Sequence, residues 1–404
     1  MTNPSEPMAS GRDYERLAFL HAPDATLILS DLGAEVLRAE SHTRLDMARL
    51  APPFVDEAGT VSCMHAYLNR NKRSIALDLK RKEAVGIVER LVVEQGYDVI
   101  VEQFRPGVMD KLGLGYDRLR TLCGGLIYCS ITGYGQTGPW RDRAGHDINY
   151  LALAGVMSYS GGAGQGPCLM GIQVADVGSG SKDAAVAILA AVVSRMNTGR
   201  GRYIDVSMTD GVYPFHAVSG IGVLVGAQEP SYGTEILNGG SLYGFYRTKD
   251  GRYISFGGLE PQFVTTFLET LGLGGYVGRL MEPGITEELK RKVSEVVASE
   301  DLAHWQGVFA GVDACVEPVL GVKEAFSHPH ARSRGIVVDV PGPGGKSIPQ
   351  VACPVKFSGF EPVYERCGPS LGRDTSDVLA SLGYTEDEIA EMQSQGIVYR
   401  GPTP

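Results

Sequence analysis

The first half of the chain alternates short apolar segments with amphipathic ones, and this alternation predicts a layered α/β fold. An amphipathic helix followed by a short strand is predicted over residues 24–40. The same order recurs, with strands at 72–80, 97–103 and 125–132 and a helix at 82–96. Strands that alternate with helices of about 10 to 15 residues predict a mostly parallel, Rossmann-like sheet, with ligands at the carboxyl ends of its strands. The preceding segment, GRDYERLAF, matches a strand poorly.

The middle of the chain continues with apolar helical patterns. Helices are predicted at 147–160 and 178–197, followed by a strand at 202–208 and an apolar helix that ends near residue 225. These elements extend the large α/β domain.

A change in composition near residue 228 divides the chain. Residues 228–332 are predicted to form a smaller α+β domain, with a strand at 252–258. The segment 333–404 is rich in Gly and Pro and ends in a predicted helix at 385–394. We expect it to return to the large domain that begins with residues 1–227.

Composition and charge narrow the class of protein. The 404 residues are 43% apolar and 21% charged, and 37 Lys and Arg against 47 Asp and Glu give a net charge of −10. This composition is globular, and the acidic balance argues against a protein that coats nucleic acid or an anionic membrane. A polyanionic ligand therefore needs a local basic cluster.

The cysteine pattern and the start of the chain indicate a cytoplasmic protein. The seven cysteines include no Cys-x-x-Cys pair, which is typical of a reducing compartment and predicts neither a disulfide framework nor a metal site. The chain start lacks a basic region followed by an apolar run, and no run of about 18 apolar residues occurs.

One segment, residues 70–82, concentrates positive charge in this acidic chain. Six cations accompany the single acid Asp78: Arg70, Lys72, Arg73, Lys80, Arg81 and Lys82. Together with Arg38 and Arg105 they could hold phosphates at the strand ends, or they could form a solvated rim. The sequence has neither a P-loop nor a dinucleotide fingerprint, so another phosphorylated ligand is implied.

Six motifs occur in one order along the chain. They are NRNKRSIALDLK (69–80), VEQFRPGVMDKLGLGYDRL (101–119), LIYCSITGYGQTGPWRDRAGHDINY (126–150), QVADVGSG (173–180), RMNTGRGRYIDVSMTDG (195–211) and DACVEPVL (313–320). In this order they resemble the family III CoA-transferases, which include 2-methylacyl-CoA racemases and heteromeric enzymes such as benzylsuccinate CoA-transferase. The resemblance implies a CoA thioester as substrate, no tightly bound cofactor, and an interlocked dimer of ring-like chains. By motif position it places these residues at the CoA site: Arg38, Arg73, Leu79, Lys80, Phe104, Arg105 and Lys111.

Asp176 is the candidate nucleophile. By sequence alone it could be an ordinary aspartate capping the following helix. A carboxylate can also attack a thioester to give a mixed anhydride and a thiolate, which is the role that the resemblance gives to Asp176. Gly178 and Gly180 would let the backbone approach the acyl group and stabilise an oxyanion.

His146 and Glu260 support a different chemistry. A histidine in a loop is usually structural or exposed, but a neutral imidazole can remove the α-proton of a thioester. In the racemases that this chain resembles, the histidine of Gly-His-Asp-Ile-Asn-Tyr and the aspartate exchange that proton, and a glutamate matching Glu260 orients the histidine.

Two departures from the family pattern bear on the choice between a transferase and a racemase. Val177 follows the aspartate where racemases usually have Phe, which favours the transferases. The N-terminal turn, residues 19–26, lacks two glycines of the family and has Asp24 in place of an aromatic residue.

We expect reversible transfer of CoA from an acyl-CoA to a carboxylic acid, by a homodimer or by a heteromer with a paralogous chain. The alternatives are a 2-methylacyl-CoA racemase and a non-catalytic partner subunit.

Overall fold

The computed structural model describes residues 16–20, 23–56 and 59–401, which form two units. Unit 1 contains the described residues up to Tyr150, together with Ile172–Val212 and the chain from Pro329 onward. Unit 2 contains Leu151–Gly171 and Tyr213–His328. Unit 2 therefore includes segments that precede the predicted small domain.

The additional segments of unit 2 are bonded to each other. The Tyr159 hydroxyl lies 3.0 Å from Nδ1 of His216, and the Tyr232 hydroxyl donates to the carbonyl of Met157 at 2.9 Å. Because these bonds are long-range in sequence, composition alone does not indicate this boundary.

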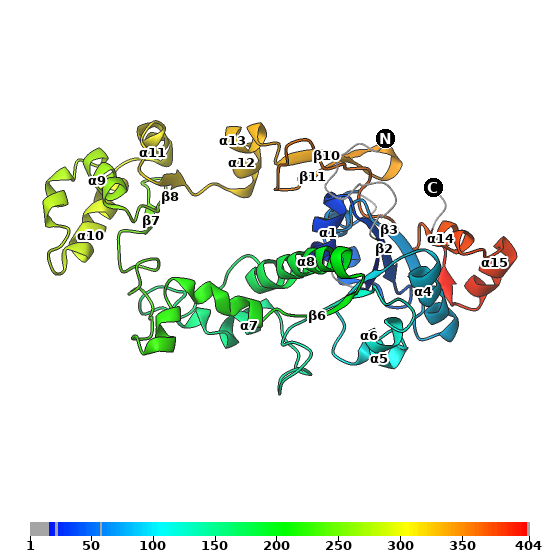
Figure 1. Cartoon of the computed structure of the whole chain (residues 1–404). Coiled ribbons are helices and arrows are strands. Elements are labelled where there is room, and N and C mark those ends of the chain that lie inside the picture. The colour runs from blue at the N-terminus through cyan, green and yellow to red at the C-terminus, as the bar shows by residue number, and fades with distance from the viewer. Residues whose placement is uncertain (1–15, 21–22, 57–58, 402–404) are drawn as a thin grey trace. The chain divides into compact units, whose positions relative to one another are not determined.

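Unit 1 is built on a sheet, of which Figure 1 labels β2, β3 and β6. In the described residues its strands have the order β12-β3-β2-β1-β4-β5-β6. The strands are β1 (Arg16–Leu20), β2 (Glu35–Glu40), β3 (Arg73–Leu77), β4 (Val99–Glu102), β5 (Ile127–Thr132), β6 (Arg202–Ser207) and β12 (Val398–Tyr399). β1 to β6 pair in parallel, and β12 pairs antiparallel with β3. The predicted parallel α/β sheet is confirmed.

The expectation of a poor strand before residue 20 is wrong for its described part. β1 lies at the centre of the sheet, where Ala18 is paired with Leu37 of β2 and with Ile100 of β4. Backbone pairing on both sides outweighs a weak local preference, because strand propensity depends strongly on context.

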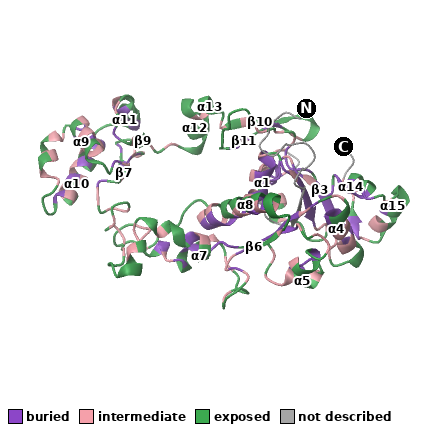
Figure 2. Cartoon of the chain, viewed as in Figure 1, coloured by how far each residue is buried: buried purple, intermediate pink, exposed green. Residues whose placement is uncertain are grey.

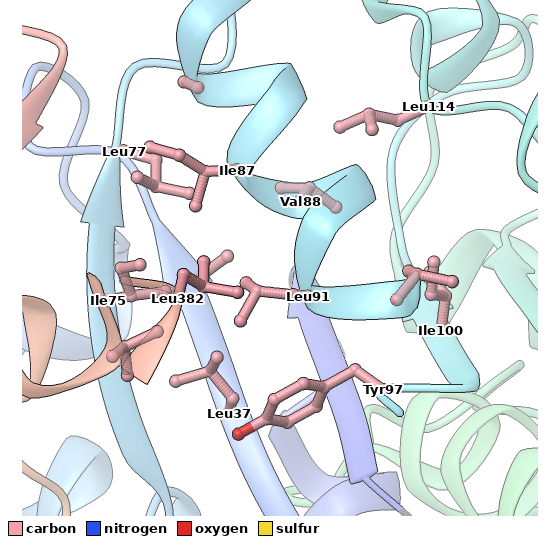
Figure 3. Packing of buried hydrophobic residues seen from close by; sticks show 14 of the residues in the cluster. Leu37, Ile75, Leu77, Ile87, Val88, Leu91, Tyr97, Ile100, Leu114 and Leu382 are labelled. Atoms are coloured by element: carbon pink, nitrogen blue, oxygen red, sulfur yellow. The ribbon is translucent and has the colours of Figure 1, made fainter. Parts of the chain in front are cut away.

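One face of the sheet packs against α4 (Lys82–Glu94). The helix buries Ala84, Ile87, Val88, Leu91 and Val92, the three-and-four spacing of an amphipathic helix. Figure 3 shows Ile87 beside Leu77 of β3 and Leu91 beside Leu382, and Leu37 and Ile75 of the sheet belong to the same cluster. Two helices from the end of the chain, α14 (Thr375–Ser381) and α15 (Glu386–Ser394), complete this core, and Figure 1 shows them beside α4.

A second set of helices covers β5 and β6. It consists of the π-helix η2 (Ala175–Ser181) and α8 (Lys182–Thr198), and α1 (Pro23–Asp31) packs against both of these helices and against β2. Within the part of the chain that the structure describes, Ala175–Thr198 is the one helical segment long and apolar enough to span a membrane. Its buried residues include Ala184, Ile188 and Ala191, small and apolar side chains that suit close packing on β5 and β6.

The remaining elements of unit 1 connect these layers. They are α2 (Met47–Leu50), α3 (Cys63–Leu68), α5 (Val108–Leu112), α6 (Tyr116–Leu119), α7 (Asp147–Leu153, which continues into unit 2), α13 (Pro329–Ser333), η6 (Pro343–Gly345), and the hairpin β10 (Val337–Pro341) and β11 (Ser347–Val351).

Unit 2 has an antiparallel sheet with the order β7-β8-β9 and an apolar core. Its elements are η1 (Val156–Ser158), η4 (Ile221–Val225), β7 (Gly244–Arg247), β8 (Tyr253–Phe256), α9 (Pro261–Thr270), η5 (Gly274–Arg279), α10 (Ile285–Val297), α11 (Leu302–Phe309), β9 (Val316–Pro318) and α12 (Val322–Ser327). The helix η3 (Asp210–Ala217) begins in unit 1 and continues into unit 2. The rings of Phe256 and Phe267 stack with centroids 3.9 Å apart, and the indole of Trp305 donates to the carbonyl of Val297.

Candidate active site

Asp176 lies in the first turn of the π-helix η2, directly before α8. A π-helix bonds each N–H to the carbonyl five residues back, and such turns occur frequently at functional sites. The Ser181 hydroxyl donates to the carbonyl of Asp176 at 3.1 Å, and the Ser179 hydroxyl donates to the carbonyl of Met208 at 2.6 Å. Asp176 is half-buried and has helical neighbours on both sides, so it does not occupy the N-cap position.

The carboxylate of Asp147 holds the start of this helix. Its Oδ1 accepts the N–H of Ala175 at 2.6 Å and the N–H of Asp176 at 3.1 Å. Asp147 is the first residue of α7 and follows His146, whose own N–H donates to Oδ1 of Asn149 at 3.0 Å. Asp147 follows His146 in the sequence and accepts the backbone N–H of Asp176, and in this way it brings His146 and Asp176 into one site.

Burial and neighbouring charge set the acidity of Asp176. Partial burial raises its pKa, the charge of Asp147 raises it further, and the charge of His146 lowers it. Burial and the charge of Asp176 also raise the pKa of Tyr150, to about 12. The site therefore holds a desolvated, more basic carboxylate beside an imidazole.

Close backbone packing shapes the surroundings of this carboxylate. The Tyr150 hydroxyl donates to the carbonyl of Gly145 at 2.6 Å, and a Cβ at Gly133 would lie 2.6 Å from the Tyr150 ring. A Cβ at Gly180 would lie 2.8 Å from Cγ of Met208, so this glycine lets η2 pack closely against the chain that follows β6. Gly178, two residues after Asp176, is half-buried. The contact of Gly178 and Gly180 with an acyl group stays a prediction.

Most of the predicted CoA residues lie at the carboxyl edge of the sheet. Leu79 and Lys80 follow β3, Phe104 and Arg105 follow β4, and Lys111 lies in α5. Leu79 and Phe104 pack against the α4 core, whereas the three cations are exposed. A mixed apolar and basic surface of this kind suits a nucleotide with phosphates.

Arg38 and Arg73 lie elsewhere. Arg38 is buried inside β2, where it donates to Oδ1 of Asn69 at 2.6 Å and forms an ion pair with Asp46. Arg73 is the first residue of β3, at the opposite edge of the sheet from Lys80, and it pairs with Glu35. The place of these two side chains in a CoA site with Arg105 stays a prediction.

Two cations of the predicted basic cluster are also buried. Arg70 forms an ion pair with Asp31 and is 1% exposed. The ammonium of Lys72 donates to Oγ1 of Thr26 at 3.0 Å, and burial holds its pKa well below the usual range. Because buried charges need partners, these side chains are fixed inside the unit and do not contribute to a phosphate-binding rim.

The altered N-terminal turn approaches the same helix as Asp176. His21 and Ala22 lie outside the described residues, but Asp24 lies in the first turn of α1. Burial raises the pKa of Asp24, whereas the nearby charge of Lys72 and a hydrogen bond with Ser181 lower it. This chain therefore places the carboxyl group of Asp24 beside Ser181, five residues after the candidate nucleophile Asp176 in η2.

Glu260 belongs to unit 2, where it is the exposed N-cap residue of α9. Its predicted interaction with His146 stays a prediction. In the described ranges, no group of three or more His, Cys, Asp or Glu side chains is arranged to hold a metal ion.

Sequence reasoning missed Asp147 as a site residue. It lies beside His146 in the motif, but its partners, the N–H groups of Ala175 and Asp176, are 28 and 29 residues away. Asp147 begins α7, where an aspartate is a common capping residue, so nothing in the sequence indicated that it also holds the start of η2.

Comparisons with known proteins identify the family of the chain. The CoA-transferase family III profile matches residues 16–375. The α-methylacyl-CoA racemase of Mus musculus is 35% identical over 391 residues, which is 96% of each chain. The succinate–glutarate CoA-transferase of Agrobacterium fabrum is 34% identical and covers 95% of this chain and 97% of its own. The crystal structure of a CaiB/BaiF family protein from Brucella suis matches with a TM-score of 0.78 and 27% identity, over 95% of this chain and all of that one. With a profile match over most of its length and relatives that include both transferases and racemases, the chain belongs to CoA-transferase family III.

Proposed function

We propose that the protein transfers CoA reversibly between an acyl-CoA and a carboxylic acid, with the Asp176 carboxylate as nucleophile. The observation that supports this most is the position of Asp176, half-exposed on a helix whose backbone is fixed by Asp147. Desolvation makes a carboxylate more basic and more nucleophilic.

The proposed reaction needs no other covalent group. Asp176 attacks the thioester carbonyl, and the C–S bond breaks to give a mixed anhydride and CoA thiolate. The thiolate then attacks the aspartyl carbonyl, which releases the donor acid and leaves CoA on Asp176. An acceptor carboxylate reverses these two steps and leaves with CoA, and the Asp176 carboxylate is regenerated.

Exchange of CoA between succinyl-CoA and glutarate tests this function, because relatives with these names are similar to the chain. Asp176→Ala should reduce exchange by at least about 10³-fold, as loss of a covalent nucleophile does. Asp183→Asn is the matched control, since this exposed acid lies on α8 just beyond η2 and should retain activity. Equal activity of wild type and Asp176→Ala would contradict the proposal.

A racemase is the second candidate, favoured by the proximity of His146 to Asp176. The charge of His146 acts on the Asp176 carboxyl, so an imidazole and a carboxylate of raised pKa are available for proton exchange at one carbon. The test is whether the purified protein incorporates deuterium at the α-carbon of a 2-methylacyl-CoA without an acceptor acid. Incorporation by wild type, and its loss in His146→Ala, would establish the racemase over the transferase.

We further propose that two chains interlock in a dimer, with a second copy covering apolar side chains around η4. Ile221 is 51% exposed, Leu224 81% and Val225 89%. Monomeric proteins rarely expose such contiguous apolar surface. Light scattering should give twice the 43.2 kDa chain mass. A chain that is inert alone but active with a paralogue would instead indicate the heteromer or the non-catalytic subunit.

We propose the cytoplasm as the location. All seven cysteines are free, which suits a reducing compartment.

A further inference from the structure

Glu102, the last residue of β4, carries a buried carboxyl group at the carboxyl edge of the sheet. Its Oε2 accepts the N–H of Phe104 at 2.7 Å, and it also bonds to the Ser130 hydroxyl on the neighbouring strand β5. Because Phe104 and Arg105 follow directly, this carboxyl group fixes the turn that carries both predicted CoA residues. It is 4% exposed, so its geometry is set by the fold and not by solvent.

The carboxyl group faces a cavity of about 240 Å³ that Arg105 also lines. Ser130 and Tyr203 contribute to the same wall, and the Tyr203 hydroxyl donates to Oγ of Ser130 at 3.2 Å. Glu102 and Arg105 therefore line one small, polar and partly open cavity, so an anion that Arg105 holds in this cavity adds its charge to the surroundings of Glu102.

The charged and titratable groups near Glu102 come from the wall of the cavity and from the strands β5 and β6. From α5 and α6 these are Asp110, Tyr116 and Asp117, from β5 they are Tyr128 and Cys129, and from β6 they are Tyr203 and Asp205. Burial raises the pKa of Glu102 to about 7, the bonds from Ser130 and Phe104 lower it, and the charge of Asp110 raises it. The protonation of this carboxyl group therefore changes near neutral pH.

We propose that Glu102 is a positioning residue that couples the binding of a CoA phosphate at Arg105 to the uptake of a proton from solvent. This inference rests on the proposed function, in which Phe104 and Arg105 contact the CoA thioester. An anion beside Arg105 adds negative potential to the cavity and disfavours the ionised carboxylate. The protonated acid can still accept the N–H of Phe104, so the turn keeps its shape while the repulsion is removed. By linkage, affinity for CoA falls as pH rises through the pKa of Glu102.

Calorimetric titration of the full-length protein with free CoA between pH 6 and 8.5 tests this inference. Comparison of wild type with Glu102→Gln isolates the carboxyl group, because the titration of the CoA phosphates themselves is common to both proteins. The Kd for CoA should rise more in wild type than in the variant between the lowest and the highest pH. The extra rise should be about tenfold for each pH unit by which bound CoA raises the pKa of Glu102. Repeating the titration at pH 7.5 in two buffers with different ionisation enthalpies should show greater proton uptake by wild type.

Two further variants separate positioning from a general loss of structure. Ser130→Ala removes a donor to the carboxylate and should move the midpoint of the pH dependence upward, whereas Asp110→Asn removes a repulsive charge and should move it downward. Disruption of the fold does not produce opposite shifts. CoA binding with the same pH dependence and proton uptake in wild type and Glu102→Gln would overturn the inference and leave the proposed function intact. Wild type that fails to bind CoA at any pH would overturn both.

Discussion

The two units differ in what they bury. Unit 1 buries charged side chains from its strands and loops: Asp31, Arg38, Glu40, Arg70, Lys72, Glu102 and Asp374. In the described residues of unit 2, Thr248 is the one buried polar side chain, and the core consists of apolar and aromatic residues such as Phe267 and Leu289. Figure 2 shows buried positions in both units, so the difference is one of chemistry and not of packing alone.

This difference distinguishes unit 1, which contains the proposed nucleophile, from unit 2. A buried ion pair is weak support for stability, because desolvation offsets most of its Coulomb energy. Unit 1 nevertheless places the buried Lys72 beside Asp24 of α1, the helix that packs against η2, which carries Asp176. Unit 2 keeps its ion pairs at the surface and is stabilised mainly by apolar contact. Four predictions test this contrast, with Trp140 and Trp305, the two tryptophans, as fluorescence probes of units 1 and 2.

The largest effect is expected in unit 1 from Asp31→Ala. The change leaves the Arg70 guanidinium buried without its carboxylate and should lower the free energy of unfolding by about 3 to 5 kcal/mol. Denaturation followed by Trp140 in a Trp305→Phe background measures it. Asp31→Asn, which keeps an acceptor for the guanidinium, should lose less. A loss of less than about 1 kcal/mol would mean that the buried charges of unit 1 are dispensable.

In unit 2, Leu289→Ala should lower the free energy of unfolding by about 3 kcal/mol, because it leaves a cavity in the fully buried apolar core. The loss should follow Trp305 fluorescence in a Trp140→Phe background and leave the Trp140 transition unchanged in the complementary background. Simultaneous movement of both transitions would show that the two units unfold as one.

Acid should affect unit 1 through His65. Its Nε2 lies 2.9 Å from the carbonyl of Pro369, its Nδ1 lies 3.0 Å from the amide nitrogen of Asn69, and burial and the charge of Arg49 lower its pKa from 6.5 to about 4. The unfolded chain therefore binds a proton at a higher pH than the native chain. The associated stability is complete above pH 6.5, is reduced by about 2 kcal/mol at pH 5 and is lost as pH falls through 4. His65→Gln should flatten this dependence in the Trp140 transition, and an unchanged slope would contradict the assignment.

The smallest effect is expected from Glu295→Gln on the surface of unit 2. Glu295 pairs with Arg291 at 2.6 Å, but both side chains are exposed. Water and salt screen such a pair, so the unfolding midpoint should not move measurably. A clear shift of the midpoint would mean that surface ion pairs stabilise unit 2 as buried ion pairs stabilise unit 1.

The sequence predicted those elements whose support is local. The spacing of Ile87, Val88 and Leu91 predicted α4, and the confirmed parallel sheet followed from the alternation of strands and helices. Central β1 was not recognised, because its support comes from pairing with β2 and β4. Arg70 was placed in a basic cluster that could hold phosphates or form a solvated rim, and its burial was not recognised, because its partner Asp31 is 39 residues away in the sequence. The candidate nucleophile Asp176 was predicted from its motif, but its contact with Asp147 is long-range and required the fold.

The antiparallel strand β12 has a consequence for how the chain folds. Val398 pairs with Leu77, and the guanidinium of Arg49 donates to the carbonyl of Pro369, a contact between residues 320 positions apart. The sheet that begins with the first described residues is completed only by almost the last ones. During synthesis from the N-terminus, β3 therefore emerges long before its partner and presents an open edge while all of unit 2 is made. Contacts of such high sequence separation form slowly, so closure of this edge should be a late and slow event in folding.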